Sequence, residues 1–149
     1  MTVTIRFATT AEVRPLRLEV LRAHTTNKTV DFEGDDDATT RHLVAVDSHG
    51  EIVGVSTWLE RALDQQPHLR ALQLRGMATA ISVQNQGIGA LILAAGVDHA
   101  LSLDADLIWA NARDQALNFY NRNGFVTTGE GFIESVTRLP HHRVIKSLR

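Results

Sequence analysis

The sequence predicts a single α/β domain built around a mixed β-sheet, and three observations support this prediction. Its 149 residues match the size of one ordinary domain with a sizeable core. Hydrophobic residues make up 44% and charged residues 21% of the chain, which is a normal globular composition. Segments with strand alternation and segments with helical spacing follow one another along the chain, as in a mixed sheet flanked by helices.

The N-terminal half is predicted to form a strand, a helix, a long polar loop and a β-hairpin. Thr9 to Glu12 resembles a capping box at the start of the helix. Pro15 cannot donate a backbone hydrogen bond, so we expect the first turn to start later than this cap suggests. In chain order we expect a strand at 3–7, a helix at 13–21, a loop at 25–41 and two antiparallel strands at 42–46 and 52–59.

The C-terminal half is predicted to alternate strands and helices. Its long helix is apolar on much of its circumference and should be mostly buried. Asp114 is a candidate cap for a second helix that stops at Asn123–Gly124. In chain order we expect a strand at 72–81, the long helix at 87–103, a short strand at 107–110, the capped helix, and strands at 125–128 and 144–148.

Charge and residue usage exclude several classes of function. Lys plus Arg number 15 and Asp plus Glu 17, so the net charge of −2 argues against a dedicated nucleic-acid binder. The absence of Cys excludes disulfides, Cys-ligated zinc, iron–sulfur clusters and thiol catalysis. His68 and His99 lack metal-ligand spacing, so no metal is expected. No long apolar run and no signal peptide are evident, which predicts a cytoplasmic protein without a membrane partner.

The most informative segment is a strand that runs into a glycine-containing turn and then a helix. Backbone N–H groups in a first helical turn have no internal partners, and Gly87 and Gly89 let an anion approach them closely. The neutral side chains of residues 84–86 add donors. The dinucleotide fingerprint and the P-loop both fit poorly, because a third glycine and a lysine are missing. The alternative is a buried helix whose glycines permit close packing against a strand.

A family resemblance rests on three linked segments within residues 72–148. Gln84-x-x-Gly87-x-Gly89 resembles the pyrophosphate-binding motif of the GCN5-related N-acetyltransferase (GNAT) family, and Arg75–Thr79 resembles its pantetheine-binding strand. Asn111-Ala112-Arg113, Ala116, Phe119-Tyr120 and Gly124-Phe125 are similar to its second motif. The resemblance implies one N-acetyltransferase domain over residues 1–149. Its sheet should be mostly antiparallel with splayed central strands and flanking helices.

The resemblance also implies which residues bind acetyl-CoA as the co-substrate. The family's Asn position holds Arg113 here, with Asn111 two residues earlier, and either side chain could face the cofactor. Arg113 could instead pair with Asp114 or with a CoA phosphate. The implied binding residues are Met77, Ala78 and Thr79 for the pantetheine arm, Gln84, Asn85, Gln86, Gly87, Ile88, Gly89 and Ala90 for the pyrophosphate, and Asn111 or Arg113.

The candidate catalytic residues are Tyr120, His141 and Glu134. Tyr120 matches the family's tyrosine beside the CoA sulfur, where a phenol could protonate the leaving thiolate. The alternative for Tyr120 is a helix residue with its hydroxyl in water. The Glu that many members carry on the pantetheine strand is missing, so candidates for the general base are Glu134, His141 and His142, with His42 a further site candidate. The alternative for His141 and His142 is a surface pair.

The predicted function is transfer of acetyl from acetyl-CoA to an unidentified amine by direct attack in a ternary complex. The missing strand Glu keeps a non-catalytic acyl-CoA sensor as the alternative, and a nucleotide-binding domain unrelated to CoA is a third hypothesis. The acceptor pocket should be built from the first helix, the 25–41 loop and the last hairpin. Asp35–Asp37 could attract a cationic amine or form a solvated bend. A homodimer is possible.

Overall fold

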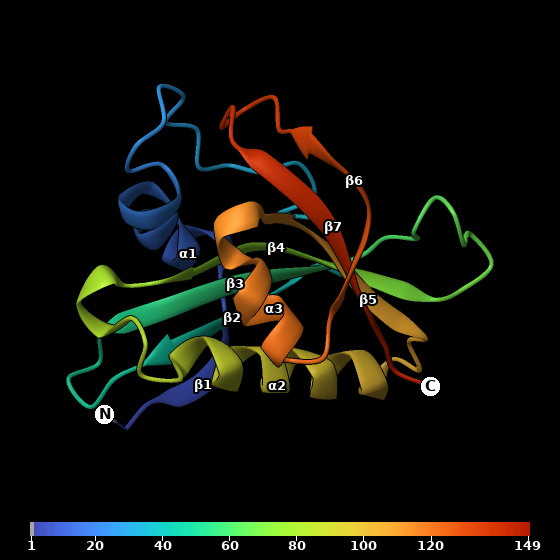
Figure 1. Ribbon diagram of the computed structural model, residues 1–149. Helices are drawn as coiled ribbons and strands as arrows, with labels where there is room; N and C mark the ends of the chain where they lie inside the picture. Colours follow the sequence, from blue (N-terminus) through green and yellow to red (C-terminus); the bar gives the residue numbers. More distant parts are fainter. Residues whose placement is uncertain (1) are drawn as a thin grey trace.

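A computed structural model describes residues 2–149 of the chain. Their strands form one twisted seven-stranded sheet (Figure 1). The strand order is β1-β2-β3-β4-β5-β7-β6, and only the β4–β5 pair is parallel. This confirms the predicted α/β domain with a mostly antiparallel mixed sheet. The elements are β1 (Thr4–Ala8), α1 (Thr10–Leu16), β2 (Arg41–Val46), β3 (Ile52–Glu60), β4 (Ala71–Thr79), α2 (Ile88–Ser102), β5 (Leu107–Arg113), α3 (Leu117–Arg122), β6 (Val126–Ile133) and β7 (Pro140–Ser147).

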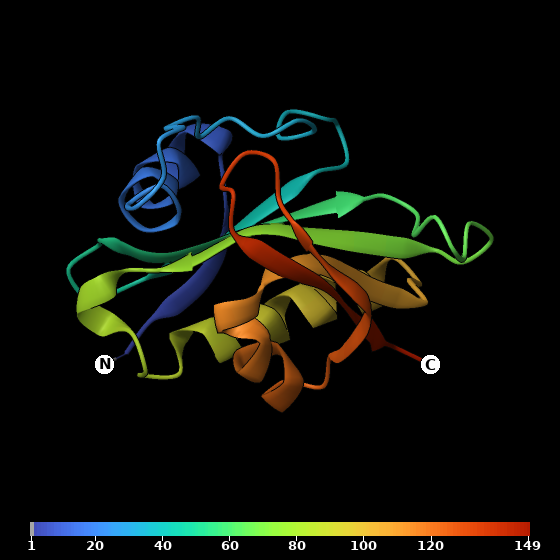
Figure 2. The same cartoon turned by 45° about the horizontal axis from the view of Figure 1, so that its top comes forward.

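The two faces of the sheet are covered by different parts of the chain. In Figure 2, α1 and the loop that follows it lie on one side of the sheet, and α2 and α3 lie on the other. Trp58 of β3 is fully buried under α2, where a Cβ on Gly96 would overlap its indole ring. The long loop after α1 lies on the opposite face from α2, where it forms one wall of a pocket.

Helix α1 starts earlier than expected. The Thr9 hydroxyl accepts from the Glu12 N–H at 3.3 Å, and the Glu12 carboxylate accepts from the Thr9 N–H at 2.9 Å. This complete capping box starts the helix at Thr10, so the prediction of a later start was wrong. Pro15 lies beyond the first turn, and the chain continues as a wider π-helical turn over Arg17–Leu21.

The central strands splay apart, as the resemblance implied. Strands β4 and β5 pair only from Ala71–Gln73 to Leu107–Trp109. Further along, Gly76 has a φ of +60° and the β3–β4 register shifts between Val55 and Thr57, so β4 bends. The edge of β4 that faces β5 is left without strand partners beyond Gln73.

The boundaries of four strands differ from those expected. Strand β4 ends at Thr79, because Ile81–Val83 form a 3₁₀ turn. Strand β5 extends to Arg113, because each of its residues pairs with β7. Strands β6 and β7 also extend further toward the turn that joins them, because Phe132 and Ile133 pair with His141 and Pro140.

Two expectations about the helices also need correction. In α2 only one stripe is buried, while Leu91 and Leu101 are 50% and 49% exposed. Asp114 does not cap α3 with its side chain, because its carboxylate contacts His142 Nδ1 at 2.6 Å. Among the described residues, no helix combines the length and the apolar character that a membrane crossing requires.

Candidate active site

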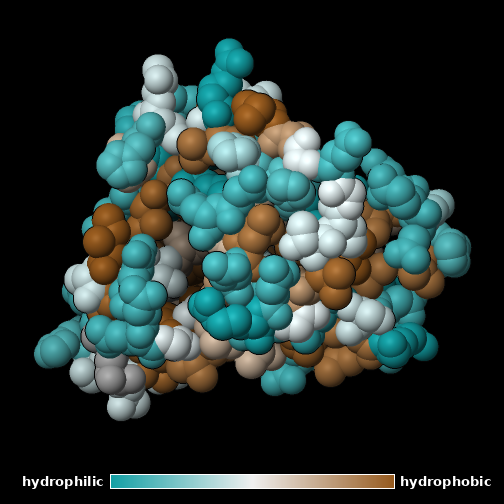
Figure 3. Space-filling model, in the orientation of Figure 1, coloured by the Kyte–Doolittle hydropathy of each residue, from teal (hydrophilic) through white to brown (hydrophobic). Residues whose placement is uncertain are grey.

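Two hollows meet where β4 and β5 diverge. The larger, called here the splay cleft, has a volume of about 1070 Å³ and runs along the end of β4, the start of α2 and α3. The smaller, the arginine pocket, has a volume of about 440 Å³ and lies under the loop after α1. The face shown in Figure 3 is hollowed between α1 and α3. The residues that line both hollows are Leu21, Met77, Arg113, Ala116 and Tyr120.

One end of the splay cleft is a turn of exposed backbone donors. Asn85 and Gly87 have φ angles of +65° and +81°, which turn the chain sharply into α2. Gly87 is the N-cap of α2 and supplies no side-chain cap, so the first N–H groups of the helix stay available to a ligand. Leu91 is the first residue to bond back, to the Gly87 carbonyl at 3.2 Å. Such a turn suits an anion such as pyrophosphate.

The other predicted residues of this turn have distinct surroundings. The side-chain amide of Gln84 donates to the Thr79 carbonyl at 3.2 Å, so Gln84 braces the turn. A Cβ on Gly89 would lie 3.0 Å from the Phe119 ring, so close packing also requires glycine there. Ile88 is buried, while Ala90 lines the cleft together with Asn85. Gln86 is exposed and does not line the cleft.

Tyr120 occupies the junction of the two hollows. It is only 6% exposed, which is contrary to the alternative of a hydroxyl in bulk water. The rings of Phe119 and Phe125 meet it edge-on with centroids 5.3 Å away and fix its orientation. Burial raises the pKa of the Tyr120 phenol far above its ordinary value, so the phenol keeps its proton at neutral pH.

Asn111 and Arg113 lie on the same face of β5 but reach different places. The Arg113 guanidinium donates to the Leu21 carbonyl at 2.5 Å and lines both hollows. The Asn111 carbonyl oxygen accepts from Arg143 at 3.2 Å, and Asn111 lines only the arginine pocket. Arg113 is thus the one of these two that borders the splay cleft, and it is not paired with Asp114.

His141 is placed to act as a base in the arginine pocket. It is 6% exposed, so it does not belong to a surface pair. Its Nδ1 lies 2.9 Å from the Leu139 carbonyl, and because a carbonyl only accepts, Nδ1 carries the proton. In that tautomer Nε2 is the acceptor nitrogen. Phe132 stacks on the ring at 5.8 Å, whereas His142 contacts Asp114 and lines neither hollow.

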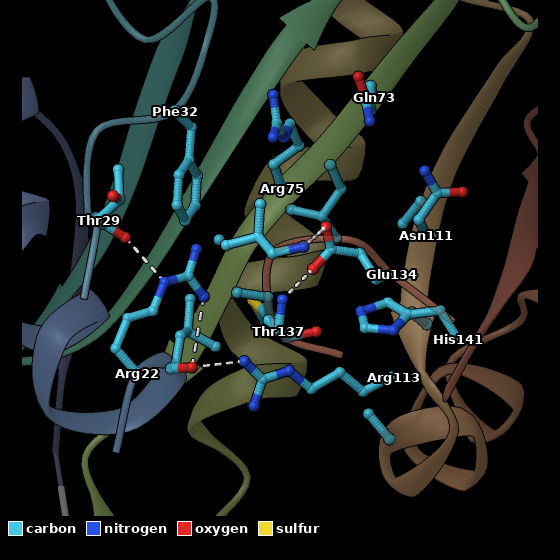
Figure 4. Close-up of a pocket in the computed structure, with 18 of the residues that line it drawn as sticks. Arg22, Thr29, Phe32, Gln73, Arg75, Asn111, Arg113, Glu134, Thr137 and His141 are labelled. Carbon is cyan, nitrogen blue, oxygen red and sulfur yellow. Dashed lines mark hydrogen bonds between the residues drawn. The ribbon is translucent and has the colours of Figure 1, made fainter. Parts of the chain in front are cut away.

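Glu134 faces the same pocket but is held as an anion (Figure 4). Burial raises the pKa of its carboxyl, yet the backbone N–H groups of Val136 and Thr137, each 2.8 Å from a carboxylate oxygen, outweigh burial. The pKa of Glu134 is consequently lowered, and an ionised carboxylate of low pKa is a weak proton acceptor. Glu134 suits the binding of a cation better than general base catalysis.

The acidic run and His42 have structural roles. Asp35 is buried and ion-paired with Arg17 at 2.7 Å, which contradicts its assignment to a solvated bend. His42 is buried beside it, with Nδ1 2.7 Å from the Thr57 hydroxyl and Nε2 3.1 Å from the Asp35 carbonyl. Neither Asp35 nor His42 lines the two hollows. This buried network instead anchors the loop that covers the arginine pocket.

Sequence reasoning missed two pocket residues, Arg22 and Phe32. Phe32 lies at the centre of an arginine cluster, with the Cζ atoms of Arg17, Arg22 and Arg75 at 4.0, 5.2 and 5.2 Å from its ring centroid. The sequence feature that could have indicated this cluster was Arg75, which lies on the strand where many family members carry Glu. Among residues 2–149, no group of three or more His, Asp or Glu side chains could hold a metal ion.

Comparisons with known proteins agree with the fold. Residues 38–127, more than half of the chain, match the model of the acetyltransferase (GNAT) domain family. The fold resembles an acyl-CoA N-acyltransferase from Pseudomonas aeruginosa, with 20% identity, 98% and 100% of the two chains covered and a TM-score of 0.76. It also resembles a GNAT-family acetyltransferase from Staphylococcus aureus, with 18% identity, 99% and 100% coverage and a TM-score of 0.74.

A third similar structure is histone acetyltransferase HPA2 and related acetyltransferase from Corynebacterium glutamicum, with 24% identity, 99% and 97% coverage and a TM-score of 0.75. At these identities the three structures speak for the fold alone. The match to the family model carries the assignment further, because it covers β3, β4, α2, β5 and α3. This chain therefore belongs to the GNAT family of N-acetyltransferases.

Proposed function

We propose that this N-acetyltransferase transfers the acetyl group of acetyl-CoA to an amine by direct attack in a ternary complex. The observation that carries the proposal is the junction of the two hollows at Tyr120 and Arg113. Each substrate then has its own site, and the reacting groups meet at a shared wall. The chain has no Cys to form an acetyl-thioester on the enzyme, in keeping with direct transfer.

The donor would lie along the splay cleft. On one side, Ala78 and Thr79 pair with Val55 and Gly54 of β3, and their other side faces the gap to β5. Backbone groups from Met77 to Thr79 would pair with the pantetheine amides as an added strand does. The backbone of residues 84–90 would hold the pyrophosphate, and Arg113, rather than Asn111, would border the donor.

Two side chains would handle the protons. When bound, acetyl-CoA supplies an acetyl thioester to the junction. His141 Nε2 would accept the proton of the attacking amine, and Glu134 would hold the amine nearby by charge. Tyr120 would donate its proton or a hydrogen bond to the departing sulfur, because it lines both hollows where they meet. Positioning of the two substrates would supply much of the remaining rate enhancement.

The test combines binding and turnover. Calorimetry with acetyl-CoA and longer acyl-CoA esters should show that acetyl-CoA binds, and thiol release over a panel of amines should reveal turnover. Acetyl-CoA binding without thiol release for any amine would favour the acyl-CoA sensor. A larger rise in melting temperature with ATP or NAD than with acetyl-CoA would favour the unrelated nucleotide-binding domain. The cytoplasmic location, the homodimer and the absence of nucleic-acid and membrane partners stay predictions.

A further inference from the structure

Three arginines from separate parts of the fold line the arginine pocket. Arg22 follows the turn after α1, Arg75 lies on β4 and Arg113 lies on β5. Arg22 is buried, and the other two are half-buried. Within residues 2–149, no carboxylate lies within 4.0 Å of any of these guanidinium groups. Buried charge without a partner is costly, so this arrangement calls for an anion.

The hydrogen bonds of these arginines leave donors unused. Arg22 Nε donates to the Thr29 carbonyl at 2.8 Å, and its Nη1 donates to the Leu21 carbonyl at 3.4 Å. Arg75 Nη1 donates to the Glu33 carbonyl at 3.0 Å. Arg113 donates to the Leu21 carbonyl. These backbone acceptors are neutral. They orient the guanidinium groups without cancelling their charge, and a guanidinium has five N–H donors.

The acidic groups around the pocket are already engaged. Asp31 pairs with Arg14 at 2.7 Å, and Glu33 pairs with Arg61 at 2.9 Å. Glu134 accepts two backbone N–H groups and lies on the other side of the pocket from Arg22 (Figure 4). Burial lowers the pKa of Arg22, and the charge of Arg113 lowers it further, while the charge of Glu134 raises it. The net effect is a lowered pKa, which a bound anion would oppose.

The donor is a poor explanation for the cluster. Arg22 and Arg75 line the arginine pocket but not the splay cleft, where the phosphates of CoA would lie. They face the space left for the acceptor. The anion that they would bind therefore belongs to the acceptor itself.

We propose that the acceptor is a small amine that bears a carboxylate, of the amino-acid type. Its carboxylate binds Arg22 and Arg75, and its amine faces His141 and Glu134. Planar guanidinium groups match a carboxylate through paired hydrogen bonds. The pocket is thus cationic on one side and anionic on the other, which is complementary to a zwitterion. This inference rests on the proposed function, because it uses the same acceptor site.

The pocket volume supports a small acceptor. About 440 Å³ falls within the range of sites for small molecules. The ring of Phe32 and the amide side chains of Asn27 and Gln73 complete the wall. They offer one apolar surface and several neutral hydrogen-bonding groups to the side chain of the acceptor.

The first experiment compares matched acceptors with the full chain and acetyl-CoA. The twenty L-amino acids are each compared with their amides, which keep the amine and lose the negative charge. For the best substrate, we expect kcat/KM to be roughly 10- to 100-fold higher for the acid than for the amide, as expected for charged hydrogen bonds. Ethanolamine and phosphoethanolamine form a further pair that tests a phosphate in place of the carboxylate.

Each outcome of this comparison decides the proposal. Equal turnover of acids and amides would overturn the carboxylate site and leave the transferase function intact. A preference confined to phosphoethanolamine would also overturn it, in favour of a phosphate-bearing amine. No turnover with any amine, together with acetyl-CoA binding, would overturn the proposed function itself, and this assignment with it.

The second experiment changes Arg75 and uses Arg70 as the matched control. Arg70 is exposed and lines neither hollow. We expect Arg75→Gln to lower the acid-to-amide ratio of kcat/KM by about tenfold or more, Arg75→Lys to restore part of it, and Arg70→Gln to leave it unchanged. If Arg75→Gln slowed acids and amides equally, Arg75 would be structural. Arg22→Gln, checked for folding by circular dichroism, repeats the measurement on the second arginine of the proposed carboxylate site.

Discussion

The splay cleft and the arginine pocket share a wall at Tyr120 but are built from the chain in different ways. The proposed anion-binding end of the cleft is one continuous segment, residues 79–90, and its candidate donors are backbone N–H groups. The arginine pocket takes single side chains from the α1 turn, the following loop, β4, β5 and the β6–β7 hairpin. A site made of backbone N–H groups persists as long as the turn keeps its conformation. A site made of side chains changes whenever one of its lining residues is substituted. Acceptor choice can therefore vary on a constant donor site.

The largest expected effect is at the junction itself. Tyr120→Phe removes the hydroxyl and keeps the ring that packs between Phe119 and Phe125. If the phenol donates a proton to the departing sulfur, kcat should fall by roughly 10²- to 10⁴-fold. The dissociation constant of acetyl-CoA should stay the same in calorimetry, because neither the turn nor β4 is altered. An unchanged kcat would show that Tyr120 only shapes the two hollows.

The next effect separates the backbone site from ordinary glycine strain. Gly87 has a φ of +81° and Gly50 a φ of +80°, and a Cβ on either would have no heavy atom within 4 Å. Alanine at each position should therefore destabilise the fold to a similar degree, about 1–2 kcal/mol, through the left-handed conformation alone. Only Gly87 lines the splay cleft. We expect Gly87→Ala to weaken acetyl-CoA binding about tenfold and Gly50→Ala to leave it unchanged.

Melting temperatures and calorimetry on the same two variants make this comparison decisive. Equal losses of melting temperature with unequal losses of binding would locate the phosphate end at residues 84–90. If both variants bound acetyl-CoA as the wild type does, the turn before α2 would not be the anion site. The donor would then have to be held mainly by β4.

The same contrast explains what could be predicted from the sequence. Gln84, Gly87 and Gly89 are close in the chain, so their spacing alone predicts the turn and, through the family resemblance, the splay of β4 and β5. Arg22 and Arg75 are 53 positions apart and meet only because the loop with Phe32 folds over β4. No local pattern encodes that approach. A pocket lined by the 25–41 loop and the last hairpin was expected, but its arginine cluster appeared only with the structure.

The roles of His141 and His142 depend on which side chain is buried, and the sequence pattern does not show this. His141 and His142 are neighbours on β7, and strand alternation turns one into the arginine pocket and the other toward Asp114. The sequence predicted candidates at both positions but not which of them faces the pocket. Asp35 was equally ambiguous, because its partner Arg17 lies 18 residues earlier in the chain.

The smallest expected effect is a difference between the two hollows in how ligand binding depends on pH. Burial lowers the pKa of His42 below its ordinary value of 6.5. The Thr57 hydroxyl accepts from Arg17 and donates to His42 Nδ1, while His42 Nε2–H donates to the Asp35 carbonyl, so the folded state holds the ring neutral. Below pH 6.5 the unfolded chain binds a proton that the folded chain excludes. The stability contributed by neutral His42 is therefore complete above pH 6.5 and is lost as the pH falls from 6.5 toward its folded pKa.

Because His42 anchors the loop over the arginine pocket, acidification should weaken acceptor binding before it weakens acetyl-CoA binding. Between pH 7 and pH 5, we expect the KM for the acceptor to rise more in the wild type than in His42→Gln, a comparison that cancels the ionisation of the amine. The dissociation constant of acetyl-CoA should change equally in both proteins. His99→Gln is the control, since burial also lowers the pKa of His99 but its ring packs on Phe7, away from both hollows. It should weaken the pH dependence of the melting temperature while leaving that of the acceptor KM as in the wild type. If His42→Gln changed the pH dependence of the acceptor KM and of the acetyl-CoA dissociation constant equally, the loop and the splay cleft would respond to pH as one unit.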